Sequence, residues 1–196
     1  MNKMGKTKLI IGSASPFRKK LLGDAGFVFD VKTADIDEKK IRHDNFERLV
    51  LDLALAKRDA ILSKHSLDPD SILITLDVVI SYKGQLREKP ISKEEVIKWH
   101  KEYSNGETTV YCSIVAHHVG LNKTLQKVDV VKVKWGKIPE RTIEQIVGDP
   151  MTYKAAGFID RAFLHYVKEL DGSIDTVIGV PIRIMEEFLE EFGYFD

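Results

Sequence analysis

Cysteine is nearly absent from this sequence, and so are long apolar runs and any excess of charge. Cys112 is the only cysteine among 196 residues, so a disulfide within the chain is excluded. Basic and acidic side chains, 30 of each, cancel, which argues against a general nucleic-acid or membrane-surface binder. No apolar run reaches the length of a membrane span, and the basic N-terminus lacks a signal-peptide pattern. We therefore expect a cytoplasmic protein in a reducing compartment, without nucleic-acid or membrane partners.

The length and composition are those of an ordinary globular protein. The chain has 43% hydrophobic and 31% charged residues, without internal repeats or low-complexity segments. A chain of this length can bury most of its apolar surface without disulfides. We expect one domain over residues 1–196, in which apolar strands alternate with amphipathic helices.

The stretch at residues 9–22 is the one around which the chain is organised. Its first three residues predict a buried strand, and a short loop then leads to a helix that Ser15 can cap and Pro16 can begin. Basic residues at 18–20 occupy the first turns, where the helix dipole favours anions. A phosphate held by backbone N–H groups and the Arg18 guanidinium would explain them. An ordinary turn with solvated basic side chains is the alternative.

Three carboxylates lie close together at residues 35–38. Asp35, Asp37 and Glu38 read either as a solvated acidic loop or as ligands for Mg²⁺ or Mn²⁺. Hard divalent cations prefer oxygen ligands, and a bound phosphate can complete their shell.

Lys57 and Asp77 stand out because each lies in an apolar setting. Lys57 shares the apolar stripe of a helix expected from about residue 45 to 63, so it either snorkels to solvent or points towards a phosphate. Asp77 interrupts the apolar run 72–80, which predicts a central strand covered on both faces. An unpaired carboxylate there would cost several kcal/mol, so Asp77 needs a partner, a proton, a metal ion or an opening to solvent.

The remaining elements follow from local signals. We expect Asp44 to cap the helix that contains Lys57, and Ser92 to cap a helix that ends near Tyr103. The pattern predicts strands at 27–31, 108–119, 125–135 and 163–170, and helices at 139–147 and 181–192. We expect Cys112 to be a core residue.

Seven short motifs follow one another along nearly the whole chain. They are Ser13-Ala14-Ser15-Pro16 with Arg18, Asp35-Ile36-Asp37-Glu38, Ala54-Leu55-Ala56-Lys57, Asp77-Val78-Val79, Glu88-Lys89-Pro90, Lys154-Ala155-Ala156-Gly157-Phe158 and Val177-Ile178-Gly179-Val180-Pro181. Each motif alone is weak, but their order is specific. Together they resemble the Maf family of nucleoside triphosphate pyrophosphatases, historically named for septum formation.

The resemblance implies a fold and a reaction. The fold is α/β, a Maf- and ITPase-like long curved mixed sheet flanked by helices, with a cleft between two lobes. The reaction is hydrolysis of a nucleoside triphosphate between its α- and β-phosphates, which gives a monophosphate and pyrophosphate in a house-cleaning role. Phosphoryl transfer needs positioning and charge neutralisation more than covalent help.

The resemblance also assigns roles to residues. Ser13, Ser15, Arg18, Lys57 and Lys89 would bind the substrate. Glu38 and Asp77 would hold Mg²⁺ or Mn²⁺, or Asp77 would accept a proton from the attacking water; the sequence leaves these two roles of Asp77 open. We expect replacement of Arg18 or Lys89 to slow the reaction with little loss of stability, because both lie beside loops.

Three positions that sort substrates by base in the family depart from its pattern. Phe17 replaces an arginine, Val78 replaces a threonine, and Arg161 falls near a glutamine of the pyrimidine-specific branch. The aromatic residue resembles the branch that acts on 7-methylguanosine triphosphate, where a ring can stack on a methylated purine. Base preference therefore stays open, as does a homodimer.

Two other functions stay open at this point. One is a nucleotide-binding regulator of cell division that does not turn its ligand over. The other is a phosphatase with an aspartyl nucleophile, which would release orthophosphate instead of pyrophosphate.

Overall fold

The computed structural model describes residues 7–154 and 161–195. The chain forms two compact units, each assembled from separate segments. Unit 1 comprises Met1–Asp77, Cys112–Val128 and Gly179–Asp196, and unit 2 comprises Val78–Tyr111 and Asp129–Ile178. Of the motif that begins at Lys154, residues 155–158 lie outside the described residues.

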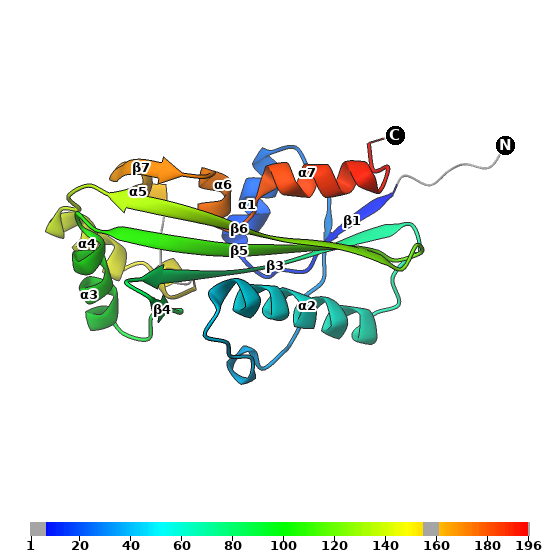
Figure 1. Cartoon of the computed structure of the whole chain (residues 1–196), viewed down its shortest axis with the longest axis horizontal. Helices are drawn as coiled ribbons and strands as arrows, with labels where there is room; N and C mark the ends of the chain where they lie inside the picture. The colour runs from blue at the N-terminus through cyan, green and yellow to red at the C-terminus, as the bar shows by residue number, and fades with distance from the viewer. Residues whose placement is uncertain (1–6, 155–160, 196) are drawn as a thin grey trace. The chain divides into compact units, whose positions relative to one another are not determined.

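A seven-stranded mixed sheet carries the fold (Figure 1). Its strands are β1 (Lys8–Ile11), β2 (Asp30–Val31), β3 (Ser71–Tyr82), β4 (Gln85–Arg87), β5 (Glu107–His118), β6 (Lys123–Trp135) and β7 (Val167–Asp171). The order is β2-β1-β3-β5-β6-β7, with β4 also paired to β3. β1 runs parallel to β2 and β3, whereas β4 and β7 pair antiparallel with β3 and β6. The expected mixed sheet flanked by helices is confirmed.

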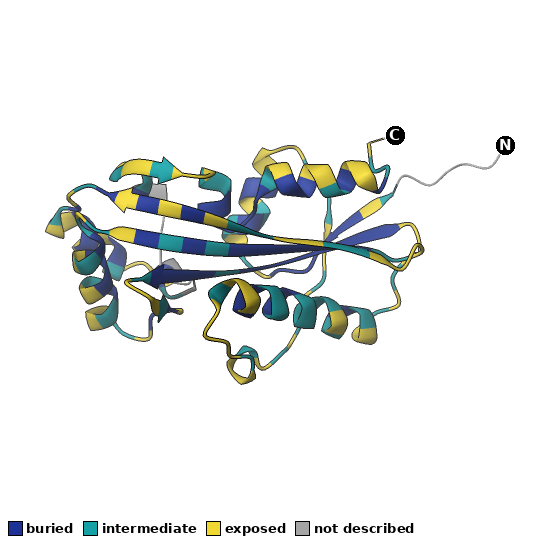
Figure 2. Ribbon diagram, viewed as in Figure 1, coloured by how far each residue is buried: buried dark blue, intermediate teal, exposed yellow. Residues whose placement is uncertain are grey.

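Unit 1 surrounds the parallel strands with helices. It holds α1 (Pro16–Asp24), the 3₁₀ turn η1 (Glu38–Lys40), α2 (Phe46–Lys64) and α7 (Ile182–Glu191). β3 is buried along nearly its whole length (Figure 2), as its long apolar run predicts. In this unit Ile10, Leu73 and Ile61 of α2 pack together. Cys112 is buried and free, as expected.

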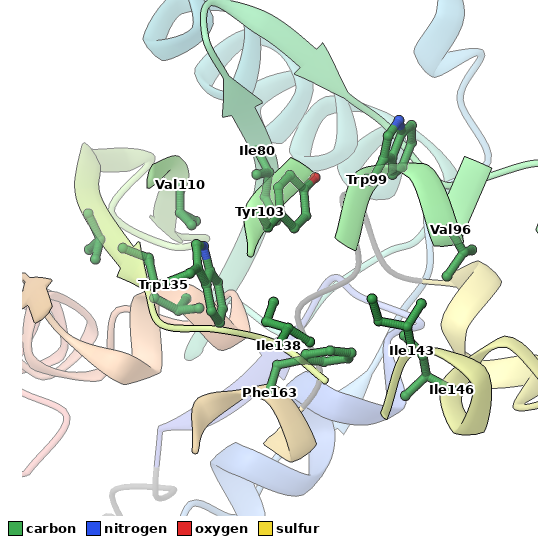
Figure 3. Packing of buried hydrophobic residues seen from close by; sticks show 13 residues of the cluster. Ile80, Val96, Trp99, Tyr103, Val110, Trp135, Ile138, Ile143, Ile146 and Phe163 are labelled. Carbon is green, nitrogen blue, oxygen red and sulfur yellow. The ribbon is translucent and has the colours of Figure 1, made fainter. Parts of the chain in front are cut away.

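Unit 2 has its own apolar core. Its helical elements are α3 (Lys93–Tyr103), α4 (Glu140–Val147), η2 (Pro150–Lys154), α5 (Arg161–Leu164) and α6 (Ile174–Ile178). Aromatic and branched side chains such as Tyr103, Trp135 and Phe163 pack in its centre (Figure 3). The Trp135 indole N–H donates to the Thr108 hydroxyl at 2.9 Å, so the polar edge of this buried ring is satisfied.

Several elements differ from the sequence expectations. The strand expected at 27–31 is reduced to Asp30–Val31, and Val28 is 85% exposed. Asn45 rather than Asp44 caps α2, through a 2.9 Å bond that its side chain accepts from the Arg48 N–H. The strand expected at 163–170 begins as α5 and becomes β7 only at Val167. Among the helices of residues 7–154 and 161–195, none combines the length with the apolar composition that a membrane span requires.

Candidate active site

The loop between β1 and α1 is tied closely to β3. The Gly12 N–H donates to the Ile74 carbonyl at 2.7 Å, and a Cβ on Gly12 would lie 2.5 Å from the Thr75 methyl. The loop therefore needs glycine for close approach. The Ser13 hydroxyl accepts a 3.3 Å bond from the Ser15 N–H, and the Ser15 hydroxyl accepts a 3.5 Å bond from the Arg18 N–H. The predicted cap at Ser15 is confirmed.

Arg18 is buried, whereas we expected it to lie beside a loop with little effect on stability. Its Nε donates to the Gly179 carbonyl at 3.0 Å, and one terminal nitrogen donates to the Ser13 hydroxyl and the Leu76 carbonyl, both at 3.2 Å. The guanidinium presents several donors in a fixed plane, so one side chain can join three segments of unit 1. Arg18 therefore ties the loop to the residue directly before Asp77.

Lys57 joins the two candidate acidic residues. Its ammonium lies 2.5 Å from an oxygen of Asp77 and 2.8 Å from an oxygen of Glu38. The Lys57 side chain is only 13% exposed, so of the two interpretations of its sequence position, the snorkelling one is wrong. α2 brings Lys57, η1 brings Glu38 and β3 brings Asp77, and all three belong to unit 1. The structure thus gathers three of the predicted site residues into one charged cluster.

Burial dominates the electrostatics of Asp77. Desolvation raises the pKa of this carboxyl above its ordinary value, and the charge and hydrogen bond of Lys57 together with the charge of Arg18 only partly oppose the rise. The charge of Glu38 adds to it. A carboxylate with a raised pKa is a better proton acceptor than an exposed one, provided that the pH keeps it ionised.

The donor set around Lys57 suits a hard divalent cation in one respect. Glu38 and Asp77 already share one cation, the Lys57 ammonium, so their oxygens face a common position. Magnesium is commonly held by one or two carboxylates together with substrate phosphates. Across residues 7–154 and 161–195, no three His, Cys, Asp or Glu side chains gather into a metal site. Because the Lys57 ammonium fills the position that these two oxygens share, Glu38 and Asp77 would hold a divalent cation through their other oxygens, with the remaining ligands from substrate and water.

The other predicted site residues lie elsewhere. Phe17 is half-buried in the first turn of α1. Val78 packs against the core cluster of unit 2, and Lys89 is exposed directly after β4 in that unit. Arg161 begins α5, and its side chain is outside the described part of the structure.

One partner in the site escaped sequence reasoning. The backbone carbonyl of Gly179, a residue at φ +98°, accepts the Arg18 bond across 161 positions of sequence. The motif 177–181 marked this segment, but no local signal predicts which carbonyl will meet a distant guanidinium.

Comparison with known proteins decides the family. The model of the family described as Maf-like protein matches residues 8–192. The chain belongs to the Maf family. The resemblance seen in the seven motifs is thereby confirmed, and the match extends through both units.

Several curated proteins are similar to this chain over nearly its full length. A 7-methyl-GTP pyrophosphatase from Dictyostelium discoideum is 30% identical over 96% of this chain and 98% of its own. A dTTP/UTP pyrophosphatase from Elusimicrobium minutum is 29% identical over 95% and 100%, respectively. A nucleoside triphosphate pyrophosphatase from Trichormus variabilis is 29% identical over 97% and 96%. A solved HAM1 protein from Coxiella burnetii aligns with 67% of this chain and 74% of its own, at 12% identity and a TM-score of 0.42.

Proposed function

We propose that this Maf protein is a hydrolase that cleaves nucleoside triphosphates between the α- and β-phosphates, releasing a monophosphate and pyrophosphate. The observation that carries the proposal is the Lys57 ammonium between the buried Asp77 and Glu38, in the same unit as the Ser13–Arg18 loop. Relatives of nearly equal length are named as pyrophosphatases of such substrates, which supports the same reaction here. The house-cleaning role is the removal of unwanted nucleotides by this reaction.

Each residue of the cluster has a task in this proposal. Asp77 accepts the proton of the water that attacks the α-phosphorus, which requires its ionised form. Lys57 holds Asp77 in place and neutralises phosphate charge as the pyrophosphate leaves. Ser13, Ser15 and Arg18 bind phosphate oxygens through the N-terminal end of α1. By resemblance to the family motif alone, Lys89 is a further candidate for substrate binding.

Glu38 and Asp77 are the residues that would hold a divalent metal, with Mg²⁺ or Mn²⁺ as the candidates. When bound, the metal neutralises phosphate charge and orients the phosphates. Asp77 then serves as ligand, as base, or in both roles in turn.

Phe17 is the candidate for reading the base. A half-buried ring next to Arg18 offers a flat apolar face without hydrogen-bonding groups, so it would select bases by size and charge. Stacking on an aromatic ring contributes about 1–3 kcal/mol per base. Val78 and Arg161 are the next positions to vary. An aromatic residue at this position favours 7-methyl-GTP, and Phe17→Arg is expected to shift the preference towards dTTP and UTP.

The setting that suits this activity is the cytoplasm, where nucleoside triphosphates are made and damaged. The zero net charge fits a small-molecule substrate better than a nucleic acid or a membrane. One Maf-like domain over residues 1–196 is part of this proposal.

Product identity is the decisive experiment. The purified chain is incubated with a panel of nucleoside triphosphates, including 7-methyl-GTP, dTTP and UTP, with Mg²⁺, with Mn²⁺ and with a chelator. We expect pyrophosphate and a monophosphate in equal amounts. Orthophosphate with a covalent aspartyl intermediate would show the alternative phosphatase, and binding without turnover would show the non-catalytic regulator. Phe17→Arg and Phe17→Ala are run on the same panel, and an unchanged ranking of substrates would remove Phe17 from the base site.

A further inference from the structure

Two buried hydroxyl groups on neighbouring strands bond to the same helix. The Thr75 hydroxyl of β3 donates to the Ala54 carbonyl of α2 at 2.8 Å. The Ser113 hydroxyl of β5 donates to the Val50 carbonyl of the same helix at 2.7 Å. Both side chains are 0% exposed, so neither hydroxyl has water as an alternative partner. Leaving a buried hydroxyl unpaired is costly, and these two bonds are therefore maintained in the folded state.

The acceptors lie on the face of α2 that carries Lys57. Val50, Ala54 and Lys57 are spaced by four and three residues, which places them on one stripe of a helix. A helix carbonyl that accepts the N–H four residues on still has a second lone pair, so each hydroxyl adds a bond without breaking the helix. Figure 1 shows α2 running alongside β3. The two bonds are one helical turn apart, so together they fix both the rotation of α2 and its position along its axis.

On β3, Thr75 also lies close to a residue of the candidate site. Thr75 and Asp77 are two residues apart on β3, so their side chains leave the same face of the sheet. The donor of the Thr75–Ala54 bond is therefore two residues from Asp77 on β3, and its acceptor is about one helical turn from Lys57 on α2. Apolar packing of Ile61 against Ile10 and Leu73 helps to hold α2 against the sheet, but such packing is non-directional and tolerates small sliding movements. Hydrogen bonds are directional, and they weaken steeply when donor and acceptor shift.

We propose that Thr75 and Ser113 are positioning residues that hold α2 in register on the sheet, so that the Lys57 ammonium meets Asp77 and Glu38 together. A shift of α2 by a fraction of a helical turn would separate Lys57 from one of its two carboxylates. The expected effect on kcat rests on the proposed function, whereas the expected effect on the position of the Lys57 ammonium is independent of it.

The first test is kinetic and uses Thr75→Val, Ser113→Ala and the conservative Thr75→Ser. Valine keeps the shape of threonine but removes the donor. Misplacing catalytic groups by about 1 Å can cost on the order of a hundredfold in rate. We expect Thr75→Val and Ser113→Ala each to lower kcat by about tenfold or more with a smaller change in KM. Thr75→Ser retains the hydroxyl and is expected to restore most of kcat.

A matched control comes from unit 2. Thr152 is also 0% exposed, and its hydroxyl donates to a helical carbonyl, that of Ile146, at 2.6 Å. Thr152→Val removes a bond of the same kind and should lower stability by a similar amount. We expect its kcat to stay at the wild-type value, because α2 is untouched.

The second test observes Lys57 itself by ¹⁵N–¹H NMR of lysine ammonium groups, with the resonance assigned by its loss in Lys57→Met. A buried, hydrogen-bonded ammonium exchanges its protons slowly enough to be seen. We expect the resonance to persist in wild type, Thr75→Ser and Thr152→Val and to broaden or vanish in Thr75→Val and Ser113→Ala. Should Thr75→Val and Ser113→Ala lose stability but keep both the wild-type resonance and the wild-type kcat, the positioning role is wrong. If wild type releases no pyrophosphate, the proposed function fails, and the NMR comparison still decides the role of Thr75 and Ser113.

Discussion

At the scale of single residues, Asp77 is a buried carboxyl group whose ionised form is costly to the folded state. Its pKa is raised above the ordinary value of 3.8, chiefly by burial. The folded state therefore favours the protonated form of Asp77 more than the unfolded state does. The contribution of this group to the free energy of unfolding is fully present only below the pKa that Asp77 has in the unfolded chain. It is lost as the pH rises through the raised folded pKa.

We expect Asp77→Asn to unfold at an equal or higher urea concentration than wild type at pH 7, and the advantage to shrink towards pH 4. The reason is that asparagine removes the desolvation penalty while Lys57 keeps Glu38 as a partner. Urea titrations between pH 4 and pH 8, with a chelator present, measure this directly. The same variant should lose several orders of magnitude in kcat if Asp77 is the base or a metal ligand. If the stability of Asp77→Asn relative to wild type is lower at pH 7 than at pH 4, the predicted direction of the pH dependence is wrong.

Arg18 is predicted to be needed for stability as well as for binding. Arg18→Ala removes three bonds inside unit 1 and leaves the Gly179 and Leu76 carbonyls without this donor. We expect a loss of about 3 kcal/mol in the free energy of unfolding, together with a large fall in kcat/KM. Arg18→Lys should recover little, because an ammonium cannot reach acceptors in the plane of the guanidinium.

The control for Arg18 lies two residues away. Lys20 is exposed on the same helix and pairs with Asp24 at 3.1 Å, so Lys20→Ala should change stability by less than about 0.5 kcal/mol. If Arg18→Ala and Lys20→Ala unfold at the same urea midpoint, the three bonds of Arg18 contribute nothing to stability.

At the scale of elements, two glycines near the candidate site are predicted to respond in opposite ways. A Cβ on Gly12 would lie 2.5 Å from Thr75, 2.8 Å from Ile61 and 3.2 Å from the Ile74 carbonyl. Gly12→Ala should therefore destabilise the protein by about 1–3 kcal/mol and displace the loop that leads to α1. Gly23 lies inside α1, and a Cβ there would enter open space, with no contact within 4 Å.

Gly23→Ala should consequently raise the free energy of unfolding by about 0.5–1 kcal/mol, since alanine is the better helix former. Thermal and urea denaturation of both variants measure the contrast. Equal effects of the two substitutions would mean that local propensity, and not the close approach at Gly12, governs this segment.

The elements that sequence predicted well are those with a complete local signal. β3 is an unbroken apolar run, and Ser15 with Pro16 announces the start of α1. The strand predicted at 163–170 was wrong at its start, because Phe163 packs into the core of unit 2 from the short helix α5. From Val167 onwards the prediction is confirmed by β7. Tertiary packing overrides propensity in such a short segment.

Some residues of the candidate site could be predicted from the sequence, whereas others could not. Asp77, Glu38 and Lys57 could be named because each is a charged residue in a recognisable motif, and the structure brings them together. The burial of Arg18 could not be predicted, since two of its three acceptors are 58 and 161 positions away along the chain. Thr75 and Ser113 look like ordinary strand residues until the helix carbonyls opposite them are known.

At the scale of the whole molecule, the chain passes between the two units four times, and three of these crossings lie inside strands; the fourth, at 178–179, follows α6. The boundaries at residues 77–78, 111–112 and 128–129 fall within β3, β5 and β6. Domain boundaries ordinarily lie in exposed, flexible linkers that few contacts cross. Unfolding one unit alone would break the hydrogen bonding of three strands partway along their length. This continuity supports the proposal of one Maf-like domain.

We therefore predict a single cooperative unfolding transition. In scanning calorimetry the van't Hoff and calorimetric enthalpies should agree, and transitions followed by tryptophan fluorescence and by circular dichroism should coincide. Gly12→Ala weakens unit 1 and Thr152→Val weakens unit 2, yet each should shift the whole transition. For a chain of this size, 1 kcal/mol corresponds to about 2–4 °C in Tm. Two separate transitions, one moved only by Gly12→Ala and the other only by Thr152→Val, would show that the units fold as independent domains.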